Sequence, residues 1–339
     1  MAKKRIAVLF GGSSKDYNVS LKSAYSVLNG LSRAAYDVIP IGITKNGRWL
    51  YFPGDYSAIK DGSWESDPDC CSAVLSPDPL HGGLIKSIED GTYSLQRLDV
   101  VFPVLHGIYG ECGQIQALCK LSEIGYVGSG FSAANACSDK VLTHLVLNKA
   151  GIKTAKYYYL ERVNIDSIEE AFSQIERCVE YPMYVKAAVS SRSVGANVAN
   201  NREELKAAIK LACSHHHKIL IEEAVVGKEL ECLVWGSVYS LNVSKIAETA
   251  ENFELVIPAD IDDSVTKEVE HAAKVAFLSL GCTNFARMSF KLTNNGVYCC
   301  KVSNVPGFTE EDIMAQLMKA SGYSYSEMLE MMIESAGEA

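Results

Sequence analysis

Two lysines stand where an ammonium group could hold phosphate. Lys140 lies in "SDKVLTH", and Lys186 interrupts "YPMYVKAAV", which is otherwise apolar and typical of a buried strand. An ammonium group in such surroundings needs a fixed anion, because a buried charge without a partner is costly. The two lysines therefore predict an anion site.

A run of acids follows in "IEEAVVGKELE". Glu222 and Glu223 end an apolar stretch, and a short linker that includes Val225 follows them. Glu229 and Glu231 are two residues apart and so share one strand face. The linker backbone could hold adenine, and a carboxylate could accept hydrogen bonds from ribose hydroxyls. A charged surface hairpin is the alternative, because solvated charges are the commoner case, and only the two lysines favour the nucleotide site.

Glycine-rich turns occur in "LFGGSS", residues 9–14, and in "LHGIYGECG". Backbone amides of such turns can hold a carboxylate or phosphate at a helix start, and open parallel sheets bind ligands at the carboxyl ends of their strands. A plain tight turn is the commoner explanation for one such motif alone. His106 in the second turn could donate to a substrate carboxylate or satisfy the turn's own backbone, and both readings stay open.

Composition excludes several other classes of protein. The 339 residues carry a formal charge of -9, which argues against nucleic acid as a partner. No apolar run approaches the roughly 18 residues of a membrane helix, and "MAKKRIAVLF" predicts a first strand rather than a signal peptide. Eleven cysteines without a CxxC spacing fit a reduced cytoplasm. Consecutive histidines at 215–217 point in different directions on a helix and indicate a solvated helix end rather than a metal site.

The elements that must position these residues alternate along the chain. "KRIAVLFGG" predicts a strand and a glycine turn, and "NVSLKSAYSVLNGL" predicts a helix with one apolar face. The first 128 or so residues therefore predict a parallel α/β domain, with residues 55–83 as a surface excursion. Strands bracketing the helix in "REELKAAIKLACSHHH" follow, and then short strands of an antiparallel sheet.

Eight blocks, taken in order, resemble the D-alanyl-D-alanine ligases of the ATP-grasp superfamily. The blocks are "GGSSKDYNVSLKSA", "VFPVLHGIYGECGQIQ", "SDKVLTHLVLNKAGI", "YPMYVKAAV", "IEEAVVGKELE", "PADID", "LGCTNFARMSF" and "VSNVPGFTEEDIMAQLMKASGYSYSEMLEMMI". "IPIGITKNGRW" and "LDVVFPVLHG" resemble the D-alanyl-D-serine branch linked to vancomycin resistance. The resemblance implies an α/β, ATP-grasp fold with an N-terminal Rossmann-like domain at 1–128, a central ATP-grasp subdomain at 129–217 and a C-terminal one at 218–339. It also implies a cytoplasmic homodimer.

The family uses ATP to phosphorylate the carboxylate of one D-alanine, and the amine of a second D-amino acid then attacks the acyl phosphate. By resemblance, Lys140 and Lys186 hold phosphates. The resemblance gives adenine and ribose contacts to Glu222, Glu223, Val225 and Glu229.

The resemblance also assigns residues to the amino-acid end of the site. Asp16 stands where a glutamate orients the first ammonium group, and Arg287 stabilises the tetrahedral intermediate. His106 and Gly307 match the family as well.

The departures lie where the metal would bind. Ser289 stands at the place of the family's first metal-binding aspartate, Lys301 at that of its glutamate and Ser303 at that of its asparagine. The resemblance implies ATP and magnesium, but two hydroxyls and an ammonium group argue against magnesium here. We predict no protein metal ligand at these positions and count Lys301 among the nucleotide-binding residues.

Two loops and one side chain also differ from the family. The loop that closes over phosphate has Ser191, Arg192 and Ser193 in place of Gly-Ser-Ser, and we count Ser193 among the nucleotide-binding residues. The mobile loop is shortened to "KIAETAENFELVIP" and has no tyrosine. Asp312 replaces a serine that receives the acceptor's carboxylate, so like charges would meet at this substrate-binding position.

These departures predict a family member for peptidoglycan precursor synthesis whose ligation is impaired or lost. A fully active D-Ala-D-Ala or D-Ala-D-Ser ligase is one alternative. A non-catalytic protein that binds a nucleotide or a partner is another. An active ligase needs carboxylate oxygens in the metal loop and a binding protein does not, which favours the binding protein.

Overall fold

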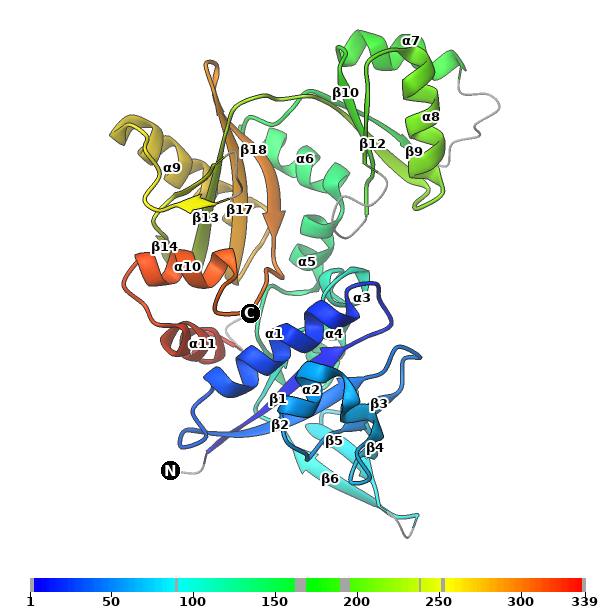
Figure 1. Ribbon diagram of the computed structural model, residues 1–339, viewed down its shortest axis with the longest axis vertical. Coiled ribbons are helices and arrows are strands. Elements are labelled where there is room, and N and C mark those ends of the chain that lie inside the picture. Colours follow the sequence, from blue (N-terminus) through cyan, green and yellow to red (C-terminus); the bar gives the residue numbers. More distant parts are fainter. Residues whose placement is uncertain are drawn as a thin grey trace.

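The computed structural model describes residues 3–88, 91–161, 169–189, 196–237, 239–250 and 254–336. These residues form an eight-stranded, a four-stranded and a six-stranded β-sheet, in that order along the chain. We refer to them as the N-terminal, central and C-terminal sheets. Figure 1 shows the N-terminal sheet at the bottom, the C-terminal sheet at the upper left and the central sheet at the upper right.

The N-terminal sheet contains the parallel core that the apolar strands predict. In chain order its elements are β1 (Lys4–Gly11), α1 (Tyr17–Gly30), β2 (Tyr36–Ile43), β3 (Trp49–Tyr51), α2 (Ser57–Asp61), η1 (Ser63–Ser66), β4 (Cys71–Leu75), β5 (Gly83–Ser87), β6 (Tyr93–Arg97), β7 (Val100–Pro103), α3 (Ile108–Glu111), α4 (Gln114–Leu121) and β8 (Gly125–Tyr126). β1 pairs in parallel with β2 and β7, and β7 pairs in parallel with β8. Ile6 to Phe10 are buried, which explains why β1 is continuously apolar rather than alternating.

Residues 55–83 are not the surface excursion that their composition predicts. Strands β3 to β6 extend the sheet by antiparallel pairing. Trp64 is fully buried and packs edge-on against Phe10, with ring centroids 5.0 Å apart. A Cβ atom on Gly42 would lie 2.2 Å from the Trp64 ring, so β2 needs glycine where this ring crosses it. The expectation was wrong because one tryptophan among polar residues forms part of the core.

Two helices connect the N-terminal and central sheets, α5 (Phe131–Ser138) and α6 (Lys140–Lys149). The central sheet contains β9 (Tyr157–Glu161), α7 (Glu169–Cys178), β10 (Met183–Ala187), β11 (Asn197–Ala199), α8 (Arg202–Cys213) and β12 (Lys218–Glu223). Its strands are antiparallel in the order β11-β10-β12-β9. The sequence predicts a boundary after residue 217, just before β12. Because β12 belongs to the central sheet, this boundary divides the sheet.

The C-terminal sheet is antiparallel, as the sequence predicts. Its elements are β13 (Lys228–Ser237), β14 (Ser240–Val243), β15 (Ala247–Thr249), β16 (Leu255–Val256), α9 (Asp263–Ser279), β17 (Asn284–Thr293) and β18 (Gly296–Ser303). The strand order is β16-β15-β13-β17-β18, and β14 pairs with β13. α9 covers one face, where Ala273 and Phe277 share an apolar cluster with Cys232 and Met288.

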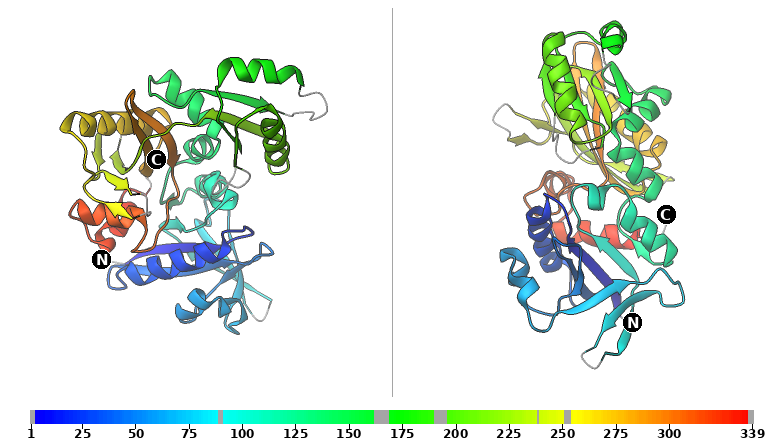
Figure 2. Two further views of the ribbon diagram at one scale, coloured as in Figure 1. Left: turned by 45° about the horizontal axis from the view of Figure 1, so that its top comes forward. Right: turned by 90° about the vertical axis from the view of Figure 1, so that its right-hand side faces the viewer.

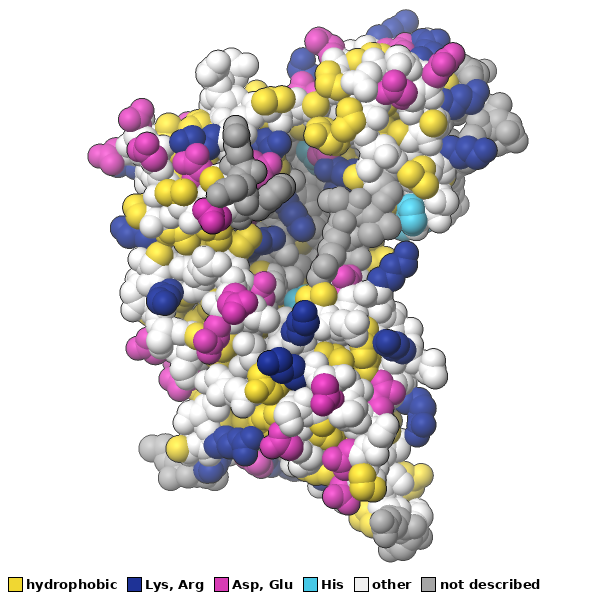
Figure 3. Space-filling model, in the orientation of Figure 1, with side chains coloured by type: hydrophobic (Ala, Val, Ile, Leu, Met, Phe, Trp, Pro, Cys, Tyr) yellow, Lys and Arg dark blue, Asp and Glu magenta, His cyan; other side chains and the backbone are white. Residues whose placement is uncertain are grey.

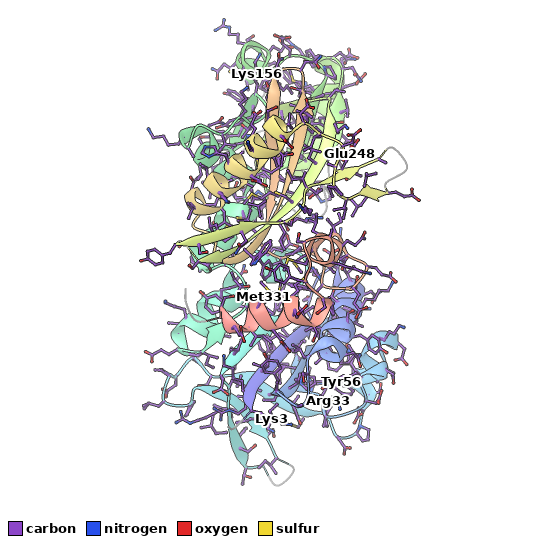
Figure 4. The ribbon with its side chains drawn as sticks, turned by 90° about the vertical axis from the view of Figure 1, so that its left-hand side faces the viewer. Lys3, Arg33, Tyr56, Lys156, Glu248 and Met331 are labelled. Carbon is purple, nitrogen blue, oxygen red and sulfur yellow. The ribbon has the colours of Figure 1, made fainter. Side chains whose placement is uncertain are left out.

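Two C-terminal helices join the C-terminal sheet to the N-terminal sheet, α10 (Ile313–Ala320) and α11 (Tyr325–Glu334). Leu329 of α11 shares one apolar cluster with Val27 of α1 and Phe285 of β17. The Ser326 hydroxyl donates to the carbonyl of Gly30 over 2.9 Å. α11 lies beside α1 in Figures 1 and 2, and Figure 4 shows its Met331 at the junction. Among the described helices, none is long and apolar enough to cross a membrane.

Candidate functional site

A cavity of about 610 Å³ is lined by residues of the central and C-terminal sheets, of helices α1, α3, α5 and α6, and of the loops that follow β1 and β7 of the N-terminal sheet. Figure 3 shows the hollow, with Lys and Arg side chains inside it. Twelve sequence-predicted residues line this cavity: Asp16, His106, Lys140, Lys186, Glu222, Glu229, Arg287, Ser289, Lys301, Ser303, Gly307 and Asp312. The fold therefore brings together groups that are up to about 300 residues apart.

Two predicted residues of the described part of the chain, Glu223 and Val225, do not line the cavity. The Glu223 carboxylate accepts a hydrogen bond from the Lys156 amide over 2.9 Å. The Val225 carbonyl accepts one from Lys291 Nζ over 3.1 Å. Glu223 is the last residue of β12, and Val225 follows it in the connection to β13. Ser193, like its neighbours Ser191 and Arg192, lies outside the described residues.

Glu222 is the centre of a buried polar network. Its carboxylate forms an ion pair with Lys186 on β10 and accepts a hydrogen bond from His144 Nε2 on α6 over 2.5 Å. The other ring nitrogen of His144 lies 3.0 Å from the Thr154 hydroxyl. Burial acts to raise the pKa of Glu222, but Lys186 and His144 outweigh it and lower the pKa to about 2. Glu222 is therefore a fixed anion near neutral pH.

Lys140 begins α6 and is held at the end of β10. Asp139 caps the helix by accepting from the Val141 and Leu142 amides over 2.9 and 3.2 Å. The Lys140 ammonium group donates to the Ala188 carbonyl over 3.3 Å. Burial, Lys186 and Lys301 lower the pKa of Lys140 to about 8. A phosphate group bound here would reverse that shift by favouring the charged form.

Two of the three positions at which the family binds metal, Ser289 and Lys301, lie in a row with Glu231 across the C-terminal sheet, whereas the third, Ser303, lies opposite Arg287. Glu231 on β13 lies opposite Ser289 on β17, which lies opposite Lys301 on β18. Ser289 donates to Glu231 Oε1 over 2.8 Å, and Arg287 Nε lies 3.8 Å from Glu231 Oε2. Burial raises the pKa of Glu231, against the lowering effect of Arg287 and Ser289. Desolvation and Arg287 lower the pKa of Lys301.

This row does not fit a magnesium ion. Magnesium takes oxygen acceptors in near-octahedral geometry, with one or two protein carboxylates. The Ser289 hydroxyl donates its hydrogen bond to Glu231. The Lys301 ammonium group has no lone pair that could bind a metal ion. Glu231 is the one carboxylate in the row, and its Oε2 is buried without a hydrogen-bond partner among the described residues. The donor set suits an anion better than a divalent cation.

Asp16 and His106, from the segments around the two glycine-rich turns, line another part of the cavity wall. Asp16 is 6% exposed, and a Cβ atom on Gly107 would lie 3.0 Å from its Oδ2 atom, so the two loops meet closely. His106 Nε2 lies 3.1 Å from the Ser23 hydroxyl. This contact supports a structural role for His106. His106 also lines the cavity, where it could donate to a substrate carboxylate.

Asp312 folds back over Gly307. A Cβ atom on Gly307 would lie 2.4 Å from the Asp312 carboxyl carbon, so any larger residue at position 307 would displace this side chain. Asp312 Oδ2 accepts hydrogen bonds from the Thr309 amide and hydroxyl over 2.7 and 2.8 Å. The carboxylate therefore caps its own loop and also places a negative charge on the cavity wall.

The structure adds two residues that the sequence analysis did not name, His144 and Glu111, and gives a contact to Glu231, which it named only beside Glu229. His144 contacts Glu222, Glu231 contacts Ser289, and Glu111 accepts from the Gly107 amide over 3.0 Å. Burial raises the pKa of Glu111, while Lys301 and Lys140 act to lower it. His144 follows Lys140 by four residues on a helix, so the i,i+4 spacing was the available signal.

Comparison with known proteins identifies the family. Residues 5–129 match the family described as D-ala D-ala ligase N-terminus, and residues 146–334 match D-ala D-ala ligase C-terminus. The chain belongs to the D-alanine–D-alanine ligase family. A D-alanine–D-alanine ligase from Thermoanaerobacter sp. (strain X514) is 36% identical over 355 positions, covering 100% of this chain and 98% of the relative. D-alanine–D-alanine ligase B from Clostridium tetani is 35% identical, covering 99% and 94%.

Solved structures of D-alanine–D-alanine ligase family members confirm the predicted fold. The VanG D-Ala:D-Ser ligase from Enterococcus faecalis has a TM-score of 0.90 at 32% identity, covering 98% of this chain and 99% of that one. A D-alanine–D-alanine ligase from Bacillus anthracis complexed with ATP shares the fold, with a TM-score of 0.71 at 20% identity and 98% and 96% coverage. The predicted mixed α/β architecture with a parallel N-terminal core and ATP-grasp sheets is therefore confirmed.

Proposed function

We propose that this chain binds ATP in the cavity and acts as an ATP-dependent D-amino-acid ligase. The observation that carries the proposal is the convergence of Lys140, Lys186 and Arg287 between the central and C-terminal sheets, beside Glu222 and Glu229. Full-length similarity to proteins described as ligases supports the same function.

The nucleotide end would use residues of α6, β10, β12 and β13. Lys140 and Lys186 would donate to phosphate oxygens as point charges. Glu222 and the backbone of residues 223–225 would face adenine. Glu229, whose side chain is 57% exposed and whose Oε1 lies 3.5 Å from Lys291, would accept the ribose hydroxyls. Ser193 remains a proposed phosphate contact.

The reaction that these residues would serve has two displacements. A carboxylate oxygen of the first D-amino acid attacks the γ-phosphorus, and ADP leaves. The amine of the second attacks the acyl carbon, phosphate leaves and the amine loses a proton. Asp16 and His106 would orient the first amino acid, and Arg287 with the Gly307 amide would stabilise the negative oxygen.

The sequence departures favoured impaired ligation, whereas the comparisons support an active ligase better, because the similar proteins are themselves described as ligases. Nucleotide binding without ligation is the second candidate. The replacements at Ser289, Lys301 and Ser303, and the carboxylate of Asp312, favour that candidate.

The cellular setting is proposed from the relatives. Synthesis of a D-alanyl dipeptide for peptidoglycan precursors, in the cytoplasm and as a homodimer, follows the family. The similarity to a D-Ala:D-Ser ligase supports D-serine as a second acceptor to be tested beside D-alanine, and with it a link to vancomycin resistance.

A paired assay separates the two candidates. ATP binding is measured by calorimetry, and phosphate release is followed with ATP, magnesium and D-alanine, with or without D-serine, while mass spectrometry identifies any dipeptide. Dipeptide formation supports the ligase. Binding without dipeptide supports the second candidate, and failure to bind ATP contradicts both. Lys186→Met should abolish the binding signal, and the exposed Lys267→Met serves as the matched control.

A further inference from the structure

Four cationic side chains converge on the cavity from four different elements. They are Lys140 on α6, Lys186 on β10, Arg287 on β17 and Lys301 on β18. Lys186 and Lys301 act to lower the pKa of Lys140, and Arg287 and Lys186 act to lower that of Lys301. Like charges held this close oppose one another, so the arrangement favours an anion between them.

Protein carboxylates leave part of this charge without a close partner. Lys186 is paired with Glu222, and Arg287 lies near Glu231. No described carboxylate lies within ion-pair distance of Lys301, although Glu111 and Glu231 act on it electrostatically from farther away. Lys301 is exposed to the solvent of the cavity and is therefore accessible to a ligand.

Hydrogen-bond donors without partners in the described part of the chain lie on the same cavity wall as Lys301, together with the carboxylates of Glu111 and Glu231. Arg287 Nε is buried without a hydrogen-bond partner among the described residues. Asn304, 4% exposed and on the cavity wall, likewise has an unpartnered Nδ2 group. Ser303 adds a hydroxyl beside them. Unpaired buried donors are costly, and phosphate oxygens are acceptors that would satisfy them.

We propose that Lys301 is the built-in counter-cation for the β and γ phosphates of ATP, so that the chain binds the metal-free nucleotide. This inference rests on the proposed ATP site and holds whether or not ligation follows. The three N–H donors of an ammonium group can bond phosphate oxygens directly. The same positive charge repels a divalent ion at that position. The ligand class is therefore a nucleoside triphosphate without magnesium.

The test is calorimetry of the full chain with ATP, once with excess magnesium and once with a chelator of divalent ions. We expect the two dissociation constants to differ by less than tenfold, a difference of about 1.4 kcal/mol. Tenfold or tighter binding with magnesium would overturn the inference while leaving the proposed ATP site intact. No binding in either condition would overturn both.

Variants assign the effect to Lys301. Lys301→Met should weaken ATP binding in the presence of the chelator about tenfold or more. The exposed control Lys267→Met should leave this affinity unchanged. Because Lys301→Met removes one of several like charges, its unfolding midpoint without ligand should not fall, which separates lost binding from lost folding. Equal affinity of the variant and the unmodified chain would overturn the inference.

A second variant reverses the charge of the site. Combining Ser289→Asp, Lys301→Glu and Ser303→Asn should make ATP binding at least tenfold tighter with magnesium than with the chelator. If the unmodified chain itself shows magnesium-dependent binding that Glu231→Gln abolishes, then Glu231 holds a metal and the counter-cation role of Lys301 is wrong.

Discussion

His144 Nε2 lies 2.5 Å from Glu222 Oε1, so a histidine on α6 fixes one oxygen of a carboxylate whose other oxygen is paired with Lys186. The two residues are 78 positions apart. Since both Glu222 oxygens have partners, the carboxylate has one orientation in the part of the cavity that we propose binds the nucleotide.

Glu222→Gln should make the free energy of unfolding depend less on pH in the acid range. The folded-state pKa of Glu222 is about 2, below its ordinary value of 4.5, so its stabilising effect is present above about pH 4.5 and is lost as the pH falls toward 2. At neutral pH the variant should lose about 1 to 3 kcal/mol, because Lys186 then lacks its anion. Urea unfolding between pH 2 and 7 measures this. If the free energy of unfolding changes with pH in the same way in the variant and in the unmodified chain, the prediction is wrong. The exposed Glu180→Gln is the control.

His144→Leu should weaken ATP binding about tenfold, because one hydrogen bond to a charged group contributes on the order of 1.5 kcal/mol. His144→Gln, which can still donate, should recover part of the affinity. Calorimetry on both variants and on the neighbouring, exposed Leu145→Ala gives the comparison. Unchanged affinity in His144→Leu would show that Glu222 does not need this partner.

ATP affinity should fall as the pH rises above about 8. The pKa of Lys140 is lowered to about 8 in the free protein, and phosphate binds the charged ammonium form, so that form is lost above this pH. Binding near pH 8 should therefore take up protons, which titrations in two buffers of different ionisation enthalpy measure. Lys140→Arg should bind without this uptake, because arginine stays charged. Equal proton uptake in the variant would assign the effect to another group.

Asp312→Ser should increase phosphate release that depends on D-alanine. The Asp312 carboxylate lies on the cavity wall, where it would repel the carboxylate of the acceptor. The expected change is a several-fold lower KM for the acceptor, with kcat less affected. An unchanged KM would show that the Asp312 carboxylate does not repel the acceptor.

Trp64→Ala should destabilise the N-terminal sheet by about 3 to 5 kcal/mol, since it leaves a large cavity against Phe10 and Phe52. Chemical unfolding measures the loss. Val74→Ala on β4 is a suitable control because Val74 is 50% exposed. A loss below about 1 kcal/mol would show that the residues 55–83 contribute little to the core.

The sequence by itself determined the family, the order of the elements outside residues 55–83 and twelve of the residues on the cavity wall. It could do so because each signal is local: Lys186 in an apolar strand, Glu222 and Glu229 around a short linker, and a glycine turn after an apolar strand. The parallel core was predictable for the same reason, since a doubly covered strand such as Ile6 to Phe10 must be apolar throughout.

Only the tertiary structure decided which side chains meet. The register of β13, β17 and β18 places Glu231 beside Ser289 and Ser289 beside Lys301. A shift of one residue would turn these side chains to the opposite face, and no local pattern specifies that register. The contact of His144 with Glu222 and the burial of Trp64 likewise depend on partners from distant segments, because packing is a property of the assembled elements rather than of any one of them.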